Sequence, residues 1–357
     1  MPILDDICTA KTKGIAAKDV AQTGKYPVFG ATGLVGYLDT FEVENEYVGI
    51  IKDGAGVGRT NIYPAKSSLL GTMQYILPKE NTDIKYLMYL LRSLNLGCSS
   101  AGAAIPHIYF KNYKKNIVPN FDLNKQRCIS KLLEKIENLI VLKKKQLFSL
   151  DELVKSRFIE MFDTIDMSEE RKDWVELEKI SKIYSGTTPS TKDAENWNGD
   201  IHWITPAEMN KDTFYITDTV RKITEKGRKS KSLEMMPTNT VLLSTRAPIG
   251  KVGITGVPMT CNQGFKNFGC GDKLNPIYLY ILLKENTEYL NSLGSGTTFL
   301  EVSKSKIAKT KIPVPPIELQ NNFAEFVKQV DKSKFIVQKQ IEDLQELLDS
   351  KMDEYFG

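Results

Sequence analysis

Apolar residues recur alternately four and three positions apart along two long stretches of the chain, 123–162 and 319–356. This spacing is the a/d pattern of a coiled coil, and neither stretch contains glycine or proline. Proline precedes each stretch, at Pro119 and Pro316, where the start of a helix tolerates it. We therefore predict two long helices with apolar seams. The seam residues are Ile129, Leu133, Ile136, Ile140, Leu147, Leu150, Val154 and Met161 in the first helix, and Phe323, Val327, Val330, Val337, Ile341, Leu344, Leu348 and Tyr355 in the second.

The second stretch repeats the first at a constant offset. Ile129 corresponds to Phe323 and Met161 to Tyr355, both 194 positions apart. Several identities at this offset lie off the seam, so a shared heptad pattern alone does not explain them. The identical pairs are Gln126/Gln320, Lys145/Lys339, Gln146/Gln340, Leu150/Leu344, Glu152/Glu346, Ser156/Ser350, Glu160/Glu354 and Phe162/Phe356. The alternative, two unrelated surface helices, would leave the common register to chance.

The segments in front of the two helices also correspond, although more loosely. The aligned segments are 54–59 with 246–251, 86–91 with 278–283, and 101–105 with 295–299. Both parts are rich in short β-type runs separated by glycine and asparagine turns. The sequence therefore predicts an α+β chain made of two copies of one unit, each a mixed α/β domain followed by a long helix. The predicted boundaries are 1–118, 119–171, 172–314 and 315–357.

The composition is that of an ordinary globular protein, with 41% hydrophobic and 26% charged residues in 357. A net charge of +4 permits a nucleic-acid partner without requiring one, because binding depends on where the charges lie. No apolar run approaches the roughly 20 residues that cross a membrane. The first residues carry acids where a signal peptide needs bases. We therefore expect a cytoplasmic protein without a membrane segment.

Cysteine and histidine give no sign of a metal or disulfide site. The five cysteines are Cys8, Cys98, Cys128, Cys261 and Cys270, and no two of them form a CxxC pair. We interpret them as reduced structural thiols. His107 and His202 are the only histidines, which excludes a histidine-rich metal site.

Two segments resemble catalytic motifs but lack essential residues. Asn275-Pro-Ile-Tyr278 is close to the Asn/Asp-Pro-Pro-aromatic loop of amino-methyltransferases, but Ile277 replaces the second proline and no glycine-rich cofactor loop accompanies it. We interpret it as an Asn-Pro helix start. In 53–60, Asp53 stands where a phosphate loop needs glycine and Arg59 where it needs lysine. We interpret that segment as a glycine-rich loop that another surface approaches closely.

The second half carries two motifs in succession. Tyr184-Ser-Gly-Thr-Thr-Pro-Ser190 is followed by Trp197-Asn-Gly-Asp-Ile-His-Trp-Ile-Thr205. They closely resemble the target recognition domain of type I restriction–modification specificity subunits, which carries Gly-x-Thr-Pro-Ser and then Trp-x-Gly-Asp-Ile-x-Trp. In the first half, 26–37 and 50–58 resemble the other common form of this domain, although the Thr-Pro-Ser segment is weak there. Pro315-Pro-Ile-Glu-Leu-Gln320 resembles the opening of the family's spacer helix, and 120–126 is a looser copy.

The resemblance implies a DNA-reading subunit that is not itself an enzyme. It implies two target recognition domains and two spacer helices that pair as an antiparallel coiled coil with pseudo-twofold symmetry. The implied partners are double-stranded DNA with an asymmetric, split target, two methyltransferase subunits, and restriction or translocase subunits. S-adenosylmethionine, ATP and magnesium would bind those partners, with no cofactor in this chain. The rival hypotheses are a self-contained methyltransferase or nuclease, and a DNA-binding regulator or scaffold that acts without an enzyme.

Base edges are read by paired donors and acceptors, while lysine and arginine hold phosphates. The candidate DNA-binding residues are Lys52, Arg59, Gln74, His107 and Lys111 in the first domain, and Thr188, Ser190, Arg246, Lys251, Asn262 and Gln263 in the second. We expect Trp197 and Trp203 to belong to the core. Phe148, Phe158 and Phe162 either form a docking surface for methyltransferase subunits or cap the paired helices internally.

Overall fold

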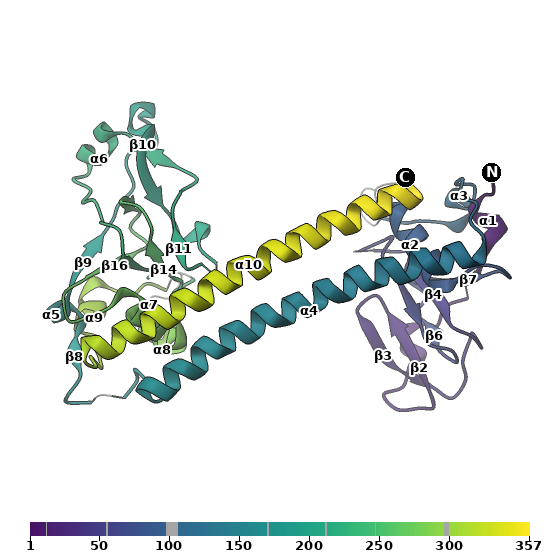
Figure 1. Ribbon diagram of the computed structural model, residues 1–357, viewed down its shortest axis with the longest axis horizontal. Helices are drawn as coiled ribbons and strands as arrows, with labels where there is room; N and C mark the ends of the chain where they lie inside the picture. The colour runs from purple at the N-terminus through teal and green to yellow at the C-terminus, as the bar shows by residue number, and fades with distance from the viewer. Residues whose placement is uncertain are drawn as a thin grey trace. The chain divides into compact units, whose positions relative to one another are not determined.

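The computed structural model describes residues 1–11, 13–54, 56–97, 106–169, 171–210, 213–246, 248–295 and 300–357. These residues form two compact units, Met1–Gln146 with Val337–Gly357, and Leu147–Ile336. Each unit contains one mixed α/β domain and part of both long helices (Figure 1). The predicted boundaries separate the domains from the helices. The two compact units instead each combine one domain with the helix segments that pack on it. Cys98, the predicted repeat segment 101–105 and residues 296–299 of its counterpart 295–299 lie outside the described residues.

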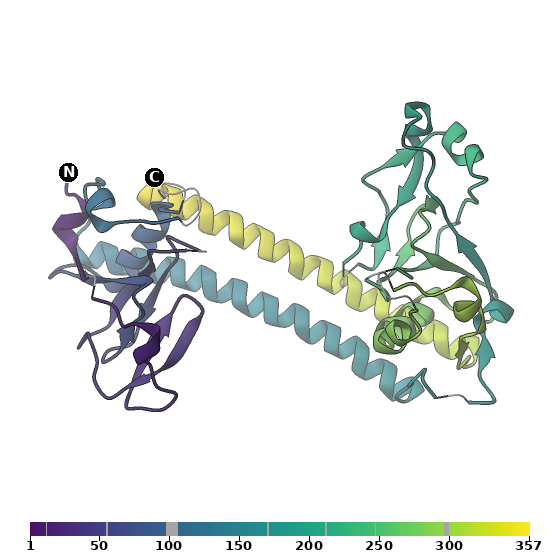
Figure 2. The ribbon, with the colours of Figure 1, turned by 180° about the vertical axis from the view of Figure 1, so that it is seen from behind.

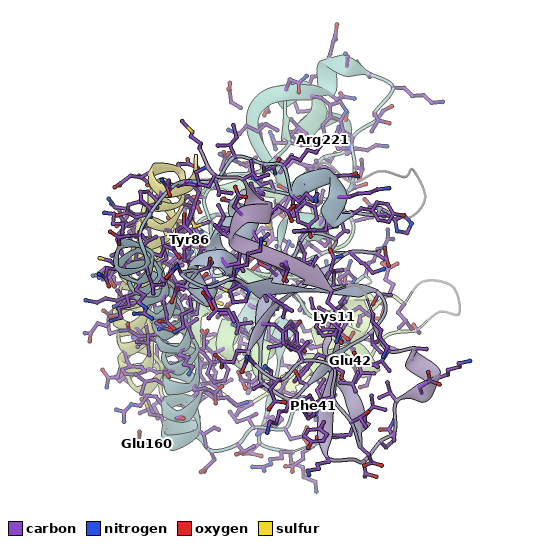
Figure 3. All side chains as sticks on the ribbon, turned by 90° about the vertical axis from the view of Figure 1, so that its right-hand side faces the viewer. Lys11, Phe41, Glu42, Tyr86, Glu160 and Arg221 are labelled. Carbon is purple, nitrogen blue, oxygen red and sulfur yellow. The ribbon has the colours of Figure 1, made fainter. Side chains whose placement is uncertain are left out.

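The first unit is built on a four-stranded antiparallel sheet in the order β1-β7-β4-β5, with a smaller sheet β3-β2-β6 beside it. All five residues of β4 are buried because the sheet is covered on both faces. The ion pair between Lys11 and Glu42, at 2.9 Å, ties β1 to the segment before β4 (Figure 3). The elements are α1 (Leu4–Ile7), β1 (Cys8–Lys11), η1 (Ala17–Asp19), β2 (Tyr26–Gly30), β3 (Gly33–Leu38), β4 (Tyr47–Ile51), β5 (Thr60–Tyr63), β6 (Ser68–Leu69), β7 (Met73–Pro78), α2 (Ile84–Ser93), α3 (Phe110–Tyr113) and α4 (Leu123–Phe162).

The second unit contains the segments coloured teal to green in Figure 2. It has a five-stranded sheet in the order β11-β14-β13-β16-β9, a three-stranded sheet β12-β10-β15 and the pair β17-β8. Its largest hydrophobic cluster lies between the five-stranded sheet, α7 and the long helices. The elements are β8 (Val175–Glu176), α5 (Leu177–Ile180), β9 (Ser181–Ser185), η2 (Ala194–Asn196), β10 (Trp197–Ile204), η3 (Pro206–Glu208), β11 (Tyr215–Ile216), β12 (Lys222–Ile223), α6 (Glu225–Ser230), β13 (Thr240–Leu243), β14 (Val252–Thr255), β15 (Met259–Cys261), β16 (Lys266–Cys270), α7 (Pro276–Glu285), α8 (Thr287–Ser292), α9 (Lys304–Lys309), β17 (Lys311–Ile312) and α10 (Ile317–Phe356).

The two domains share one topology, which confirms the repeat predicted from sequence. The order β1-β7-β4-β5 in the first matches β9-β16-β13-β14 in the second, and β3-β2-β6 matches β12-β10-β15. In both small sheets the central strand pairs parallel with the last strand and antiparallel with the other. The buried helix α2 packs on β4 and β5, and α7 packs on β13 and β14. The predicted α+β fold with two mixed domains is therefore present.

Both long helices occur as predicted: α4 has the expected bounds and α10 begins at Ile317, two residues early. Every predicted seam residue is buried or half-buried. In the second unit, Phe158 of α4 lies 5.5 Å from Phe323 of α10, and Asp151 forms an ion pair with Lys334 at 2.6 Å. The helices therefore run antiparallel, since residues further along α4 contact residues nearer the start of α10. Lys334 interrupts the apolar seam, and Asp151 compensates its charge.

In the first unit the same two helices meet in the same sense. The Lys125 ammonium, near the start of α4, lies over the ring of Tyr355 near the end of α10, at 5.7 Å. The end of α10 also reaches the domain, because Phe356 packs on Tyr86 of α2 with ring centroids 5.3 Å apart. In the second unit Phe162 packs on Tyr278 of α7 at 4.9 Å in the corresponding way. Each domain is thus fixed to the end of the long helix that follows the other domain in sequence.

A buried glutamine at the start of each long helix joins that helix to its own domain. The amide of Gln320 donates to the carbonyls of Lys273 and Pro315, at 3.1 and 2.7 Å, and its oxygen accepts from the Asn275 N–H at 2.9 Å. Gln126 makes the same three bonds in the first unit, with Asn81, Phe121 and the N–H of Asp83. Asp83 and Asn275 are the N-caps of α2 and α7. The predicted Asn-Pro helix start at Asn275 is therefore confirmed.

Candidate functional site

The tryptophans of the second domain form the core of its small sheet, as predicted. Trp197 and Trp203, both on β10, meet edge-on with centroids 5.1 Å apart and pack with Ile223 and Leu233. Their indole N–H groups donate to the carbonyls of Ser190 and Thr187, both at 3.1 Å. The motif that carries the tryptophans is therefore hydrogen-bonded directly to the Thr-Thr-Pro-Ser segment.

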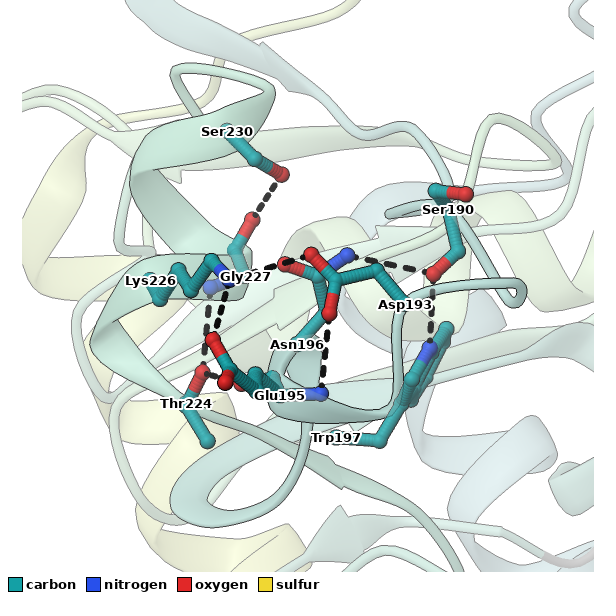
Figure 4. A network of polar contacts seen from close by, with 9 residues as sticks. All are labelled: Ser190, Asp193, Glu195, Asn196, Trp197, Thr224, Lys226, Gly227 and Ser230. Atoms are coloured by element: carbon teal, nitrogen blue, oxygen red, sulfur yellow. Dashed lines mark hydrogen bonds and ion pairs between the residues drawn. The ribbon is translucent and has the colours of Figure 1, made fainter.

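Polar contacts around Ser190 hold this segment in place (Figure 4). Its carbonyl accepts from the Asn196 side chain as well as from Trp197. Lys226 of α6 forms ion pairs with Asp193, at 3.2 Å, and with Glu195. The hydrogen bonds from Asn196 and Trp197 use only the backbone carbonyl of Ser190, and this residue is exposed.

The structure brings the Thr188 segment together with the Asn262-Gln263 segment. The Thr188 hydroxyl donates to Gln263 Oε1 at 2.8 Å. The Asn262 side-chain oxygen accepts from the Gly264 N–H at 2.9 Å, which fixes the turn. Gly186 approaches so closely that a Cβ there would lie 1.9 Å from the carbonyl oxygen of Cys261. The side chains of Thr188, Asn262 and Gln263 are half-buried and form one polar cluster.

Arg246 lies beside this cluster on the loop after β13. Its guanidinium forms an ion pair with Glu301 at 3.0 Å, and both side chains are partly exposed. The preceding residue, Thr245, donates its N–H to the carbonyl of Gly264 at 2.8 Å, so this loop and the Asn262 turn are joined. Hydrogen bonds therefore join the three segments that carry the candidates Thr188, Arg246, Asn262 and Gln263.

Lys251, a predicted DNA-binding residue, also has a role inside the protein, and its contact with DNA stays a prediction. Its ammonium donates to the carbonyls of Pro206 and Met209 at 2.8 and 2.6 Å. Both hydrogen bonds go to the 206–209 turn, so the Lys251 side chain stabilises this turn.

In the first domain, Lys52 and His107 meet on a shared carboxylate. Asp53 accepts from the Lys52 ammonium at 2.8 Å and lies 2.7 Å from His107 Nδ1. Burial alone would raise the pKa of the Asp53 carboxyl, but its hydrogen bonds with Lys52 and His107 hold that pKa below its usual value. The Asp53–His107 and Arg246–Glu301 contacts are both isolated bridges between the same two segments of the repeat, although the sequence alignment pairs Arg246 with Gly54.

The remaining first-domain candidates divide between surface and core. Arg59 and Lys111 are exposed, and the Lys111 ammonium lies 5.4 Å from the centre of the Tyr109 ring. Gln74 is a correction, because it is 2% exposed and its side-chain oxygen accepts from the buried Tyr113 hydroxyl at 3.0 Å. Strand β7 runs through the middle of the sheet, which places Gln74 in the core and out of reach of DNA.

The glycine-rich segment of the first domain is a loop with a close backbone approach, as predicted. Gly54, Gly56 and Gly58 all have positive φ angles, between +84° and +86°. A Cβ at Gly58 would lie 2.6 Å from the backbone nitrogen of Gly97. The space left by the missing side chain is therefore filled by the protein's own backbone, and no phosphate is needed to explain it.

The described residues offer no metal-binding cluster of histidine, cysteine and carboxylate side chains. The four described cysteines are free, and burial raises the pKa of the Cys8, Cys261 and Cys270 thiols to about 12. Among the described helices, none has the length and apolar character required to cross a bilayer.

The model of the type I restriction modification DNA specificity domain matches residues 3–151 and again 170–346. These two matches cover most of the chain and coincide with the two repeats. The chain belongs to the type I DNA specificity family. Its relatives include the specificity subunit of the type I restriction enzyme MjaIX from Methanocaldococcus jannaschii, 42% identical over 177 residues, which are 48% of this chain and 41% of that subunit. The EcoR124I/EcoR124II specificity subunit from Escherichia coli is 25% identical over 335 residues, 89% of this chain and 82% of that one.

Solved structures show the same fold. The S subunit of a type I restriction–modification system from M. genitalium superposes with a TM-score of 0.64 at 15% identity, covering 100% of this chain and 95% of that one. A chain from a study of complex assembly and conformational transition of the type I R-M system gives a TM-score of 0.62 at 17% identity, covering 99% and 96%. At these identities the likeness concerns the fold alone.

Within the type I DNA specificity family fold, the aromatic residues at the end of α4 have an internal role. Phe158 is buried, and Phe162 packs on Tyr278 and Phe323. Both therefore cap the paired helices inside the second unit. Phe148 is 67% exposed, so for this residue the predicted docking surface for methyltransferase subunits stays a prediction.

Sequence reasoning missed Arg221, which is exposed and lies with its guanidinium 3.5 Å from the centre of the Trp197 ring. No motif of the type I DNA specificity family marked this position. The available signal was weak: one arginine close to a β run, 24 positions after the tryptophan. Only the pairing of β12 with β10 brings the two together.

Proposed function

We propose that this chain is the DNA-reading specificity subunit of a type I restriction–modification complex, and that it reads an asymmetric target in two parts. One observation carries the proposal: the two domains share a topology, yet their corresponding loops carry different chemistry. Where the first domain has Asp53 and His107, the second has Arg246 and Glu301. Two copies of one reader with different polar side chains would recognise two different half-sites.

In the second domain the polar cluster of Thr188, Asn262 and Gln263 would meet base edges. Hydroxyl and amide groups supply both donors and acceptors, and a glutamine or asparagine amide matches the two-point edge of adenine. Arg246, Arg59 and Lys111 would hold phosphates, which fixes register without reading sequence. Lys52 and His107 share a carboxylate, so they would offer DNA a pair of donors with a fixed geometry.

The long helices would set the number of unread base pairs between the half-sites. A helix of 40 residues is about 60 Å long, and one turn of DNA is about 34 Å. Inserting four residues into both helices should therefore change the unread gap and leave both half-sites as they are. This proposal fails if such an insertion changes the recognised bases themselves.

The helices would also dock the catalytic partners. Each carries two exposed apolar residues at the same repeat position: Val141 and Leu142 on α4, and Phe335 and Ile336 on α10, all at least 50% exposed. Two equivalent apolar surfaces suit two copies of one partner, and we propose two methyltransferase subunits. S-adenosylmethionine would bind those subunits, and ATP with magnesium the restriction or translocase subunits. The chain would catalyse no step itself.

The decisive experiment is methylome sequencing of a host that expresses this chain with a type I methyltransferase subunit. We expect one split, asymmetric motif that disappears when the chain is omitted. Replacing residues 1–118 by another recognition domain should change one half of that motif only. Loss of both halves would contradict the modular proposal. A methylome without a motif, together with no co-purification of the methyltransferase subunit, would favour a regulator or scaffold that acts without an enzyme.

A further inference from the structure

The exposed Arg221 is held in one orientation from two sides. Its guanidinium lies over the face of Trp197, 3.5 Å from the ring centre, and 5.5 Å from that of Trp203. Its backbone carbonyl accepts from the Thr219 hydroxyl at 2.8 Å and from the Trp203 N–H at 3.2 Å. Trp197 is itself fixed through the Ser190 carbonyl. An arginine on the surface ordinarily samples many rotamers, and this one has lost much of that freedom already.

The donors of Arg221 are unused within the described part of the chain, where its guanidinium makes no ion pair or hydrogen bond. Its charged neighbours differ in this respect. Lys222 is paired with Asp218 at 3.1 Å, Arg228 with Glu225 at 2.6 Å, and Lys226 with two carboxylates. Lys222, Lys226 and Arg228 are therefore neutralised by carboxylates, whereas the guanidinium of Arg221 keeps its donors for another molecule.

The first domain also places a cation on the aromatic residue that begins its central small-sheet strand. The Lys25 ammonium lies 5.3 Å from the centre of the Tyr26 ring, and Tyr26 meets Phe41 edge-on at 4.8 Å. Tyr26 begins β2 and Trp197 begins β10, the central strands of the two small sheets. Figure 3 labels Phe41 in the first unit and Arg221 in the second. Both domains therefore place a cation beside the first residue of this central strand, although Lys25 is the chain neighbour of Tyr26 and Arg221 comes from the segment before β12.

We propose that Arg221 is a DNA-contacting residue of the second domain, preorganised by Trp197. This inference rests on the proposed function. A guanidinium flat on an indole presents its N–H groups in its own plane, which suits two acceptors side by side. Such pairs are O6 and N7 of guanine, or two phosphate oxygens. Since the side chain is already ordered, little further entropy is lost when it binds.

The test uses the full chain co-purified with its methyltransferase subunits and two duplexes, one with the motif found by methylome sequencing and one with both half-sites scrambled. The variants are Arg221→Ala, Arg221→Met and Arg221→Lys. Methionine keeps an apolar cover over Trp197 and so controls for simple loss of packing. The matched control is Lys231→Ala, which removes the same charge from an exposed position in the same part of the domain.

We expect Arg221→Ala and Arg221→Met to weaken binding of the motif duplex by about 5- to 150-fold, the range for a lost bidentate contact, and Lys231→Ala by less than about threefold. A guanine contact would relax methylation at one base pair of the second domain's half-site. A phosphate contact would instead weaken both duplexes and reduce the slope of log K against log salt by about one. Arg221→Lys would retain charge but lose the two-point contact.

Two results would overturn the inference. The first is wild-type discrimination between the duplexes combined with unchanged binding by Arg221→Met. The second is an equal loss in Arg221→Met and Lys231→Ala, which would show that only net charge matters. If the wild-type complex itself fails to discriminate the duplexes, the proposed function fails, and the role of Arg221 fails with it.

Discussion

Replacing Gln320 by leucine should loosen the junction between α10 and α7 and leave the first unit unaffected. Leucine has nearly the same volume but cannot make the three hydrogen bonds to the Lys273 and Pro315 carbonyls and to the Asn275 N–H. At about 1 kcal/mol for each bond, the loss is about 3 kcal/mol. This corresponds to a roughly hundredfold larger opening equilibrium at the start of α7.

Amide hydrogen exchange measures this effect directly, because Gln320 accepts from the Asn275 amide. Peptides that cover the start of α7 should exchange much faster in Gln320→Leu, while peptides around Asp83 should not change. Gln126→Leu should produce the reverse pattern, since Gln126 accepts from the Asp83 amide. Gln340→Leu, an identical change at an exposed position of the same helix, should alter neither region.

The reasoning would be refuted if Gln320→Leu exchanged like Gln340→Leu at the start of α7. It would also be refuted if Gln320→Leu and Gln126→Leu deprotected the same peptides, because the two junctions would then not be independent.

Three further predictions concern single side chains. Lys251→Met should lower the free energy of unfolding by about 2–3 kcal/mol, because two hydrogen bonds from a charged group to the 206–209 turn are lost. The salt dependence of DNA binding should not change. An unchanged denaturation curve with a reduced salt slope would contradict this prediction. Burial lowers the pKa of Lys266 from 10.5, so the unfolded chain holds this proton to higher pH than the folded chain. Lys266→Gln should therefore be more stable than wild type at pH 7, and denaturation should show the difference shrinking as pH rises towards 10.5; a variant less stable at pH 7 would show that the ammonium is favourably bound. With a thiol reagent at pH 8, peptide mapping should find the exposed Cys128 labelled and Cys8 unlabelled, because burial raises the Cys8 pKa to about 12; rapid labelling of Cys8 would contradict its burial.

Periodicity made the long helices predictable. The seam from Ile129 to Val154 and its repeat from Phe323 to Leu348 follow from local spacing, and this spacing is sufficient to predict helices of this length. The repeat itself was also visible, because identical residues off the seam recur at one offset. The paired strands of the two domains could not be assigned with the same precision. Their order depends on contacts between segments many residues apart, and short β runs specify no partner.

The candidate site was predictable in composition but only partly in geometry. Thr188 and Gln263 were chosen from separate motifs, and the structure joins them through a hydrogen bond. Gln74 and Lys251 were chosen for the same polar chemistry, yet their side chains satisfy internal carbonyl and hydroxyl groups. A sequence shows that a residue can donate or accept, but not whether the fold has already used that capacity. Arg221 was missed for the opposite reason: its donors are available, but only strand pairing places it over Trp197.

The packing of Phe356 on Tyr86 has a consequence for biosynthesis. These two residues of the first unit are about 270 positions apart, and a ribosome adding about 5–20 residues per second needs roughly 14–54 s to synthesise that interval. During this time the apolar face of α2 has emerged without the helix end that covers it. We therefore expect this face of α2 to lack its contact with Phe356 until α10 has been synthesised, and to offer apolar surface to a chaperone during that time.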